Sequence, residues 1–359
     1  MRFVSGLCAV ALTALACFSN AVPAKDVDDV PSPDRKAWMA YQQNMFDALS
    51  TSQDPHDWVI ASIIHFAGSS ASERKAGGDL LERAAQALPD DAPTQWLAIQ
   101  LCPTVKTPPV CDSAMTTLER IEPDNAAVWL QALNRAALLR DVVGVEVALE
   151  RMAASTHFDD HLLDFQKRLV VVYQRFPPTS AMSDDLHRLR AGFSEANFGY
   201  VAAIAITNAM MLPTYQHLIR ACTIDAELGL HVERSADCAK VGRMLGLHGP
   251  NLVANRIGFA VLRVSRTWND ADVQAAREVD WAWMQAPRPN VSHSATVGMQ
   301  YEQDWANSGS EIGALRLAMS REGVATLPPA DWVDNSSPFS EKRLADDRRY
   351  AAEHAANPF

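Results

Sequence analysis

Several sequence patterns that accompany common enzyme activities are missing from this chain of 359 residues. It contains no Gly-x-Ser-x-Gly nucleophile elbow, no phosphate-binding loop, no Gly-x-Gly-x-x-Gly fingerprint and no His-Glu-x-x-His pair. Each absence removes one signal, for serine hydrolases, nucleoside triphosphatases, dinucleotide-dependent enzymes and zinc peptidases respectively. We therefore predict no catalytic residue and no cofactor, and an enzymatic activity is uncertain and disfavoured.

Positive charge is also in short supply. The chain has 32 lysine and arginine residues against 43 acidic ones, which gives a formal net charge of -11. Its densest basic cluster, "DDRRY" at 346–350, carries its own acids. An acidic surface repels phosphate backbones and anionic lipid headgroups. The sequence therefore predicts no nucleic-acid partner and no peripheral membrane binding.

Long apolar runs are lacking as well. The nearest candidate, 200–212, is shorter than the roughly 20 residues that a membrane-spanning helix needs, and it predicts a buried helix instead. Residues 1–24 combine one positive charge, an apolar run and a small-residue end, which is the pattern of a secretory signal peptide. We expect a periplasmic or secreted protein with no transmembrane segment in the mature chain. The alternative is a lipoprotein modified at Cys17, although Ala14 stands where that pattern has leucine.

The few cysteines fit export. Two of the six fall in the signal segment, and an even number in the rest of an exported chain favours disulfides. The remaining four are Cys102, Cys111, Cys222 and Cys238. Three pairings are possible, and the local pairs 102–111 and 222–238 are favoured because each joins the ends of two successive helices. The spacing matches neither a Cys-x-x-Cys redox motif nor the close ligand pairs of a zinc site. Beside Cys238, Arg234 and Asp237 are expected to cap or pair at the hairpin turn.

What the chain does have is helix signals throughout, with no convincing period-two alternation. In 142–152, for example, Val142, Val145, Leu149 and Met152 form one apolar stripe. The predicted helices are 32–49, 56–67, 78–88, 92–102, 111–121, 126–139, 142–152, 159–176, 194–212, 214–224, 235–247, 251–266, 269–286, 311–322 and 340–355. The sequence therefore predicts an all-α fold of stacked antiparallel helical hairpins that continues into a further helical region.

One short pattern occurs twice at a separation of 34 residues. Pro89 and Pro123 each precede an acidic residue, a short gap and then a tryptophan, Trp96 and Trp129. With Asp141 at the turn between paired helices, these residues resemble the tetratricopeptide repeat family. The resemblance implies stacked helix–turn–helix units whose first helices line a groove for a peptide or protein.

The resemblance covers roughly residues 55–155, and the glycine expected four residues after each tryptophan is replaced by Gln100 and Leu133. We predict a repeat region over 25–180 and a second helical region over 181–359, while one continuous array is equally consistent. The expected function is a protein or peptide interaction scaffold in the bacterial cell envelope, with an unknown partner. The alternative is an exported all-α enzyme acting on envelope material, with its site in the C-terminal half.

The only metal candidates are His157 and His161 in the segment "HFDDH". A spacing of four places both on one face if the segment is helical, but two ligands do not make a site. The other interpretation is a helix start, where Asp159 and Asp160 are favoured by the helix dipole. We therefore predict no metal and retain the two histidines as candidates.

Overall fold

The protein is all-α over the residues that the computed structural model describes. These are 33–66, 71–101, 109–179, 198–210, 212–224, 231–286, 295–332, 338–340 and five residues between 344 and 352. No β-strand occurs among them, and neighbouring helices pack in pairs, which confirms the predicted class. None of the described helices is both long enough and apolar enough to cross a membrane. The predicted signal segment, 1–24, lies outside this part of the chain.

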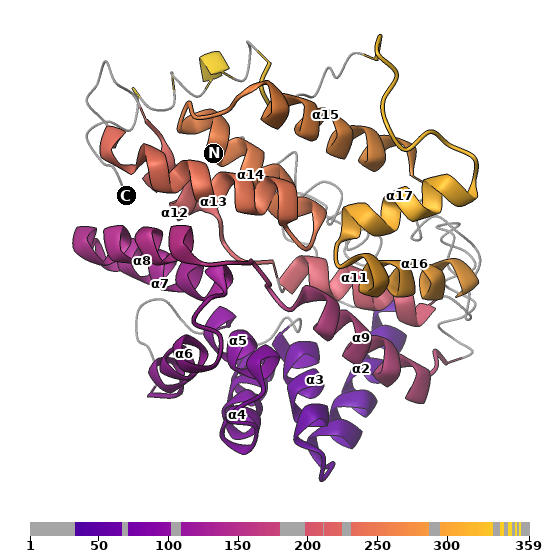
Figure 1. Ribbon diagram of the computed structural model, residues 1–359. Coiled ribbons are helices and arrows are strands. Elements are labelled where there is room, and N and C mark those ends of the chain that lie inside the picture. The colour runs from indigo at the N-terminus through magenta and orange to yellow at the C-terminus, as the bar shows by residue number, and fades with distance from the viewer. Residues whose placement is uncertain are drawn as a thin grey trace. The chain divides into compact units, whose positions relative to one another are not determined.

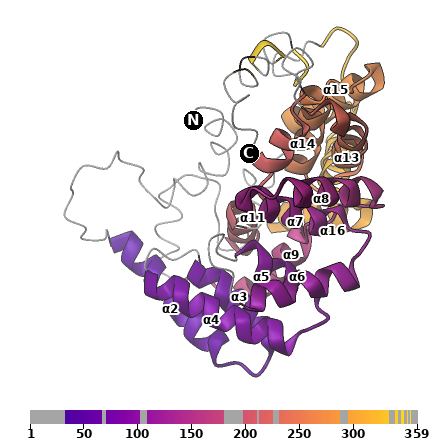
Figure 2. The same cartoon turned by 90° about the vertical axis from the view of Figure 1, so that its left-hand side faces the viewer.

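The chain divides into two compact units. Figures 1 and 2 label the helices of both. Unit 1 contains 1–101, 161–212 and 288–300, and unit 2 contains 102–160, 213–287 and 301–359. Each unit thus draws on both halves of the predicted division at 180/181, which stays a prediction.

Unit 1 contains two pairs of adjacent helices and two further helices. The elements are α2 (Pro33–Ser50), α3 (Pro55–Phe66), α4 (Ala71–Ala87), α5 (Ala92–Gln100), α9 (Leu162–Arg175) and α11 (Phe198–Met210). α3 pairs with α4, and α9 pairs with α11, while α2 packs on α3 and α5 packs on α4. The rings of Tyr173 on α9 and Phe198 on α11 meet edge to face, with centroids 5.5 Å apart. That aromatic contact places α9 within the core of the unit.

Unit 2 has two closely packed hairpins with further helices around them. Its elements are α6 (Pro109–Ile121), α7 (Ala126–Leu139), α8 (Val142–Ala154), α12 (Gln216–Cys222), η1 (Val232–Arg234), α13 (Ser235–His248), α14 (Leu252–Val264), α15 (Asp270–Gln285) and α17 (Glu311–Arg321). α7 pairs with α8, and α13 pairs with α14. A Cβ atom at Gly258 of α14 would lie 2.1 Å from the backbone nitrogen of Gly246 on α13, so this crossing requires glycine. α16 (Ala295–Ser308) begins in unit 1 and ends in unit 2.

Local capping signals explain where many helices begin. The side chain of Asn125 caps α7 and that of Asn269 forms a capping box with Asp272 at the start of α15. The predicted helix 126–139 coincides with α7. α16 was not named among the predicted helices.

The two echoed tryptophans occupy different environments. Trp96 on α5 is fully buried, as a residue at an inward turn should be. Trp129 on α7 is only half-buried, and its ring nitrogen donates to the carbonyl oxygen of Pro123 at 2.9 Å. The guanidinium of Arg151 lies 5.6 Å from its ring centroid. The packed pairs α3–α4 and α7–α8 are compatible with a helical repeat, whereas α5 and α6 belong to different units.

Candidate functional site

The first helices of the expected repeats do not line an open groove. α3 is buried along eight of its residues, including the unbroken run from Val59 to His65. The run from Thr94 to Ala98 in α5 is buried in the same way, and α7 buries nine of its fourteen residues. α7 is less enclosed than α3 and α5, because it also exposes Arg135, Leu138 and Leu139. The buried runs of α3 and α5 therefore provide no open face.

Helix α9 contributes to this enclosure by binding the N-terminal ends of α3 and α5. Arg175 pairs with the Asp57 carboxylate on α3, with one of the two hydrogen bonds at 3.2 Å. Burial alone raises the pKa of Asp57, but hydrogen bonds from Arg175 and Ser52 and the arginine charge outweigh it, so that the pKa lies below its ordinary value.

A second arginine of α9 repeats this contact two turns earlier. Arg168 donates to both carboxylate oxygens of Asp91, at 3.1 and 2.9 Å, and approaches the ring of His56 at 3.3 Å. Asp91 also caps α5 by accepting from the backbone nitrogen of Thr94. As for Asp57, burial opposes ionisation, yet the arginine and the cap hold the pKa of Asp91 below its usual value.

The segment with the metal candidates is not helical, so His157 and His161 do not share a helix face. α8 ends at Ala154 and α9 begins at Leu162, because His161 adopts a left-handed conformation with φ of 55°. His157 is exposed in unit 2 and its carbonyl oxygen accepts from the backbone nitrogen of Ala126. His161 is buried in unit 1, beside Asp164 at 3.4 Å. A metal role for either histidine remains an untested hypothesis.

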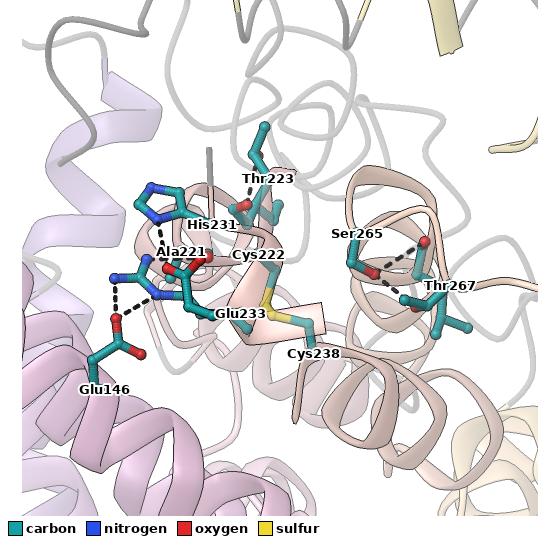
Figure 3. Close-up of a disulfide and its surroundings, with 12 residues drawn as sticks. Glu146, Ala221, Cys222, Thr223, His231, Glu233, Cys238, Ser265 and Thr267 are labelled. Atoms are coloured by element: carbon teal, nitrogen blue, oxygen red, sulfur yellow. Dashed lines mark hydrogen bonds and ion pairs between the residues drawn. A yellow bond between two sulfur atoms is a disulfide. The ribbon is translucent and has the colours of Figure 1, made fainter. Parts of the chain in front are cut away.

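One of the two expected disulfides is present. Cys222 at the end of α12 and Cys238 in the first turn of α13 are bonded, with Cα atoms 5.6 Å apart (Figure 3). This confirms the local pairing predicted for these two residues. Cys102 lies outside the described residues, as does the side chain of Cys111, so the bridge between them stays a prediction.

A buried arginine supports the loop that the disulfide closes. Arg234 has its side chain 2% exposed, and its Nε atom donates to the Glu146 carboxylate of α8 at 2.7 Å. Its guanidinium also donates to the carbonyl oxygen of Ala221, next to Cys222. Figure 3 shows Glu146 extending from α8 towards the bridged hairpin. Arg234 therefore pairs with a carboxylate, but this partner is 88 residues away on α8 rather than at the hairpin turn, and the Arg234 side chain does not cap α13.

Unit 2 also gathers carboxylates at the start of α14, which sequence reasoning did not single out. The Glu311 carboxylate accepts from the backbone nitrogen of Leu252 and from the hydroxyl of Tyr301, both at 2.7 Å. Burial raises the pKa of Glu311, while these two hydrogen bonds act in the opposite direction. One residue before Leu252, Asn251 donates to the fully buried Asp160 at 2.7 Å. No short motif signals this cluster, because its members come from distant segments.

The described surface has one concentration of large apolar side chains, and it lies at the tip of the α7–α8 hairpin. Five residues within ten positions are exposed there, and we call them the ridge. They are Leu138 (47% exposed), Leu139 (66%), Val142 (49%), Val143 (71%) and Val147 (49%). The predicted apolar stripe of α8 is thus correct for Val145, Leu149 and Met152, which are buried, and wrong for Val142. Val142 is the first residue of α8, at the outer end of the hairpin.

The chain was compared with protein-family models, curated proteins and solved structures, and none of them matches it. The geometry of its own residues is therefore the basis for the function proposed below.

Proposed function

We propose that this chain is an exported helical-repeat protein that acts through protein contacts, as an interaction scaffold in the bacterial cell envelope. The observation that carries the proposal is the ridge at the α7–α8 tip. Contiguous apolar surface is costly to leave in water, and on soluble proteins it marks sites of association. The paired helices support the repeat architecture, and a tetratricopeptide-like arrangement remains part of the proposal.

The burial of α3 and α5 determines which version of the scaffold is supported. A groove along these two helices is disfavoured because their central residues are buried, whereas α7 exposes Arg135, Leu138 and Leu139. The ridge has the opposite character, since its side chains point away from the packed faces of their own hairpin. The partner is therefore expected to bind at a hairpin tip.

The compartment is supported by the Cys222–Cys238 bridge. Disulfides persist in oxidising surroundings such as the bacterial periplasm and are rare in the reducing cytosol. Cell fractionation combined with peptide mapping without reductant tests this part of the proposal. We expect the bridged peptide in the envelope or secreted fraction, and free thiols at positions 222 and 238 in mature protein would contradict export.

Site-specific crosslinking in living cells tests the contact itself. A photoreactive amino acid at position 143 should form one discrete adduct, whereas the same residue at position 171 should not. Val171 on α9 is a matched control because it is an isolated exposed valine, 55% exposed. A wild-type-like expression level with no adduct at position 143, to this chain or to any other protein, would overturn the proposal.

A second candidate, an exported all-α enzyme acting on envelope material, is favoured by Glu311. A carboxyl group with a raised pKa beside a hydroxyl group has the character of a general acid. Purified protein should then release soluble fragments from isolated cell-wall polymer, and Glu311→Gln should abolish the release. Absence of any release by the wild-type protein would remove this candidate.

A further inference from the structure

The turn at the centre of the ridge has a symmetric chemical order. The sequence Leu138-Leu139-Arg140-Asp141-Val142-Val143 reads as an apolar pair, a cation, an anion and a second apolar pair. α7 ends at Leu139 and α8 begins at Val142, so all six residues lie at the tip of one hairpin. An apolar patch with a cation and an anion at its centre can pair with a second copy of itself, because each charge finds its opposite on that copy.

The two charged groups at the tip are open to a partner. Arg140 is exposed in a left-handed conformation with φ of 58°, and its guanidinium has no partner among the described residues. Asp141 caps α8 through Oδ1, which accepts from the backbone nitrogen of Gly144 at 3.0 Å. Its other carboxylate oxygen accepts no hydrogen bond from the described part of the chain. A cation and an anion are thus presented side by side.

In a two-fold symmetric pair, the tip of one copy is complementary to the same tip of the other copy. In a symmetric dimer, when residue i of one copy meets residue j of the other, j of the first also meets i of the second. Arg140 can therefore pair with Asp141 of a second copy twice in one interface, while the flanking leucines and valines pack around the charges. A net charge of -11 opposes association at long range, but salt screens it beyond about 8 Å at physiological ionic strength.

We propose that the ridge is the contact surface of a two-fold symmetric homodimer, in which its apolar side chains pack together and each Arg140 pairs with Asp141 of the second copy. The inference rests on the proposed function, because it names the partner of the same surface. An anionic membrane is the less suitable occupant, since the chain has a net charge of -11. The small size of one hairpin tip places the contact among weak, concentration-dependent interfaces.

Sedimentation equilibrium of the full mature chain with its disulfide intact tests the dimer. The wild-type protein should pass from monomer to dimer as its concentration is raised through the micromolar range. Val143→Glu should leave a folded monomer, because it buries a carboxylate in the apolar contact. Val171→Glu introduces the same charge at an exposed valine outside the ridge and should dimerise like the wild-type protein.

A pair of charge variants tests the geometry. Arg140→Glu presents two acids and Asp141→Lys presents two cations, so each variant alone should lose at least tenfold in dimer affinity. Mixing them should restore association as a heterodimer, since every cross-pair is again of opposite charge. Circular dichroism checks that Asp141→Lys, which also removes the cap of α8, still folds.

The possible outcomes separate the two proposals. A wild-type chain that stays monomeric at several hundred micromolar, or a dimer that survives Val143→Glu, overturns the homodimer. If such a monomer still crosslinks to another protein from position 143, the scaffold function stands and only the homodimer is lost. Restored association in the mixed charge variants supports both.

Discussion

Units 1 and 2 differ in the contacts that stabilise them, because unit 2 contains a disulfide. In the described part of unit 1, which contains no cysteine, two arginines of α9 bind carboxylates at the starts of α3 and α5. Unit 2 has a covalent bridge, Cys222–Cys238, together with the buried Arg234. Exposed ion pairs depend on salt and pH, whereas a disulfide depends on the redox state of the compartment. Unit 2 thus has a covalent bridge in addition to ion pairs such as Arg243–Asp272 and Arg321–Asp304, whereas the described part of unit 1 has reversible contacts alone.

This difference has a physical origin in the lengths of the connections. The two ion pairs that α9 makes with α3 and with the start of α5 join residues 118 and 77 positions apart, so they form only once the tertiary structure brings α9 back. The disulfide of unit 2 spans 16 residues and fixes one local hairpin. Unit 2 should therefore keep local order around α12 and α13 under conditions that open unit 1.

Removal of the disulfide should change the stability of unit 2 relative to unit 1 more than any other substitution described here. The double variant Cys222→Ser, Cys238→Ser releases a loop of 16 residues, and we expect a loss of about 3 kcal/mol in the free energy of unfolding. Urea unfolding measures the loss, and hydrogen exchange locates it. Exchange should rise in α12 and α13 and stay unchanged in α3.

Reduction with dithiothreitol in a Cys102→Ser, Cys111→Ser background is the matching control, because there it can break the Cys222–Cys238 bond alone. In that background it should reproduce the destabilisation caused by Cys222→Ser, Cys238→Ser and add nothing once those two cysteines are replaced. An equal rise of exchange in both units would show that the disulfide does not act locally.

Asn125 and Asp91, the N-cap residues of α7 and α5, each follow a proline of the repeated pattern by two residues. Replacing them should give the next largest losses of stability, and the two losses should differ. Asn125 is fully buried, and its side-chain oxygen accepts from the backbone nitrogens of Ala127 and Asp159. Asn125→Ala leaves these groups unsatisfied and should cost about 2 to 3 kcal/mol. Asp91→Ala should cost less, about 1 to 2 kcal/mol, because its pair with Arg168 is partly exposed.

Urea unfolding of both alanine variants measures this order. Glu82→Gln is a suitable control, since Glu82 is an exposed residue of α4 and its loss should change stability by less than about 0.5 kcal/mol. If Asp91→Ala proved the more damaging change, α9 would be held more tightly than the exposure of its arginines indicates.

Local signals account for what sequence analysis predicted correctly. The predicted helix over 126–139 coincides with α7, and the helix predicted over 269–286 differs from α15 by one residue at each end. The 222–238 disulfide followed from two neighbouring helix ends, since α12 ends at Cys222. The all-α class rested on apolar periodicity of the same kind.

What sequence analysis could not predict depends on distant segments. Arg175 and Asp57 are unremarkable surface charges in sequence, and only the return of α9 brings them together. The ridge was missed because Val142 continues the apolar stripe of α8, yet at the outer end of the hairpin it is left exposed. The prediction that His157 and His161 share one helix face was wrong for another reason, because the backbone at His161 is left-handed.

Acid should act with opposite sign on two carboxylates of unit 1 and on one carboxylate of unit 2. In unit 1, the pKa values of Asp57 and Asp91 are lowered from 3.8, so their stabilising contribution is present above pH 3.8 and is lost as the pH falls through the folded-state pKa. In unit 2, the pKa of Glu311 is raised from 4.5, so its ionisation penalty is present above the folded-state pKa and disappears as the pH falls towards 4.5.

Urea unfolding at a series of pH values, with Asp57→Asn and Glu311→Gln, separates these contributions. Asp57→Asn should cost about 1 kcal/mol at pH 7, and the difference from the wild-type protein should shrink below pH 3.8. The stability of Glu311→Gln relative to the wild-type protein should fall as the pH is lowered from 7 to 4.5. Parallel pH profiles for all three proteins would contradict both assignments.

The smallest expected effect concerns His231, which stands before η1 within the bridged loop. Its φ of 48° is left-handed, so His231→Gly relieves a backbone penalty of about 1 kcal/mol, but glycine gives up a similar amount in chain entropy. The free energy of unfolding should change by less than about 0.5 kcal/mol at pH 7. This near-cancellation makes the variant a clean reporter of the ring's titration.

Burial, reinforced by the charge of Arg234, lowers the pKa of His231 below 6.5. A histidine with a lowered pKa loses its stabilising contribution as the pH falls from 6.5 through the folded-state pKa, because the unfolded chain binds the proton first. Between pH 7 and pH 5, the free energy of unfolding of His231→Gly should therefore rise relative to that of the wild-type protein, by less than about 1 kcal/mol. Urea unfolding at the two pH values measures the gain. If it appeared equally in the reduced protein, the ring would stay enclosed without the disulfide, and the enclosure would be attributable to Arg234 and Glu146 rather than to the covalent bridge.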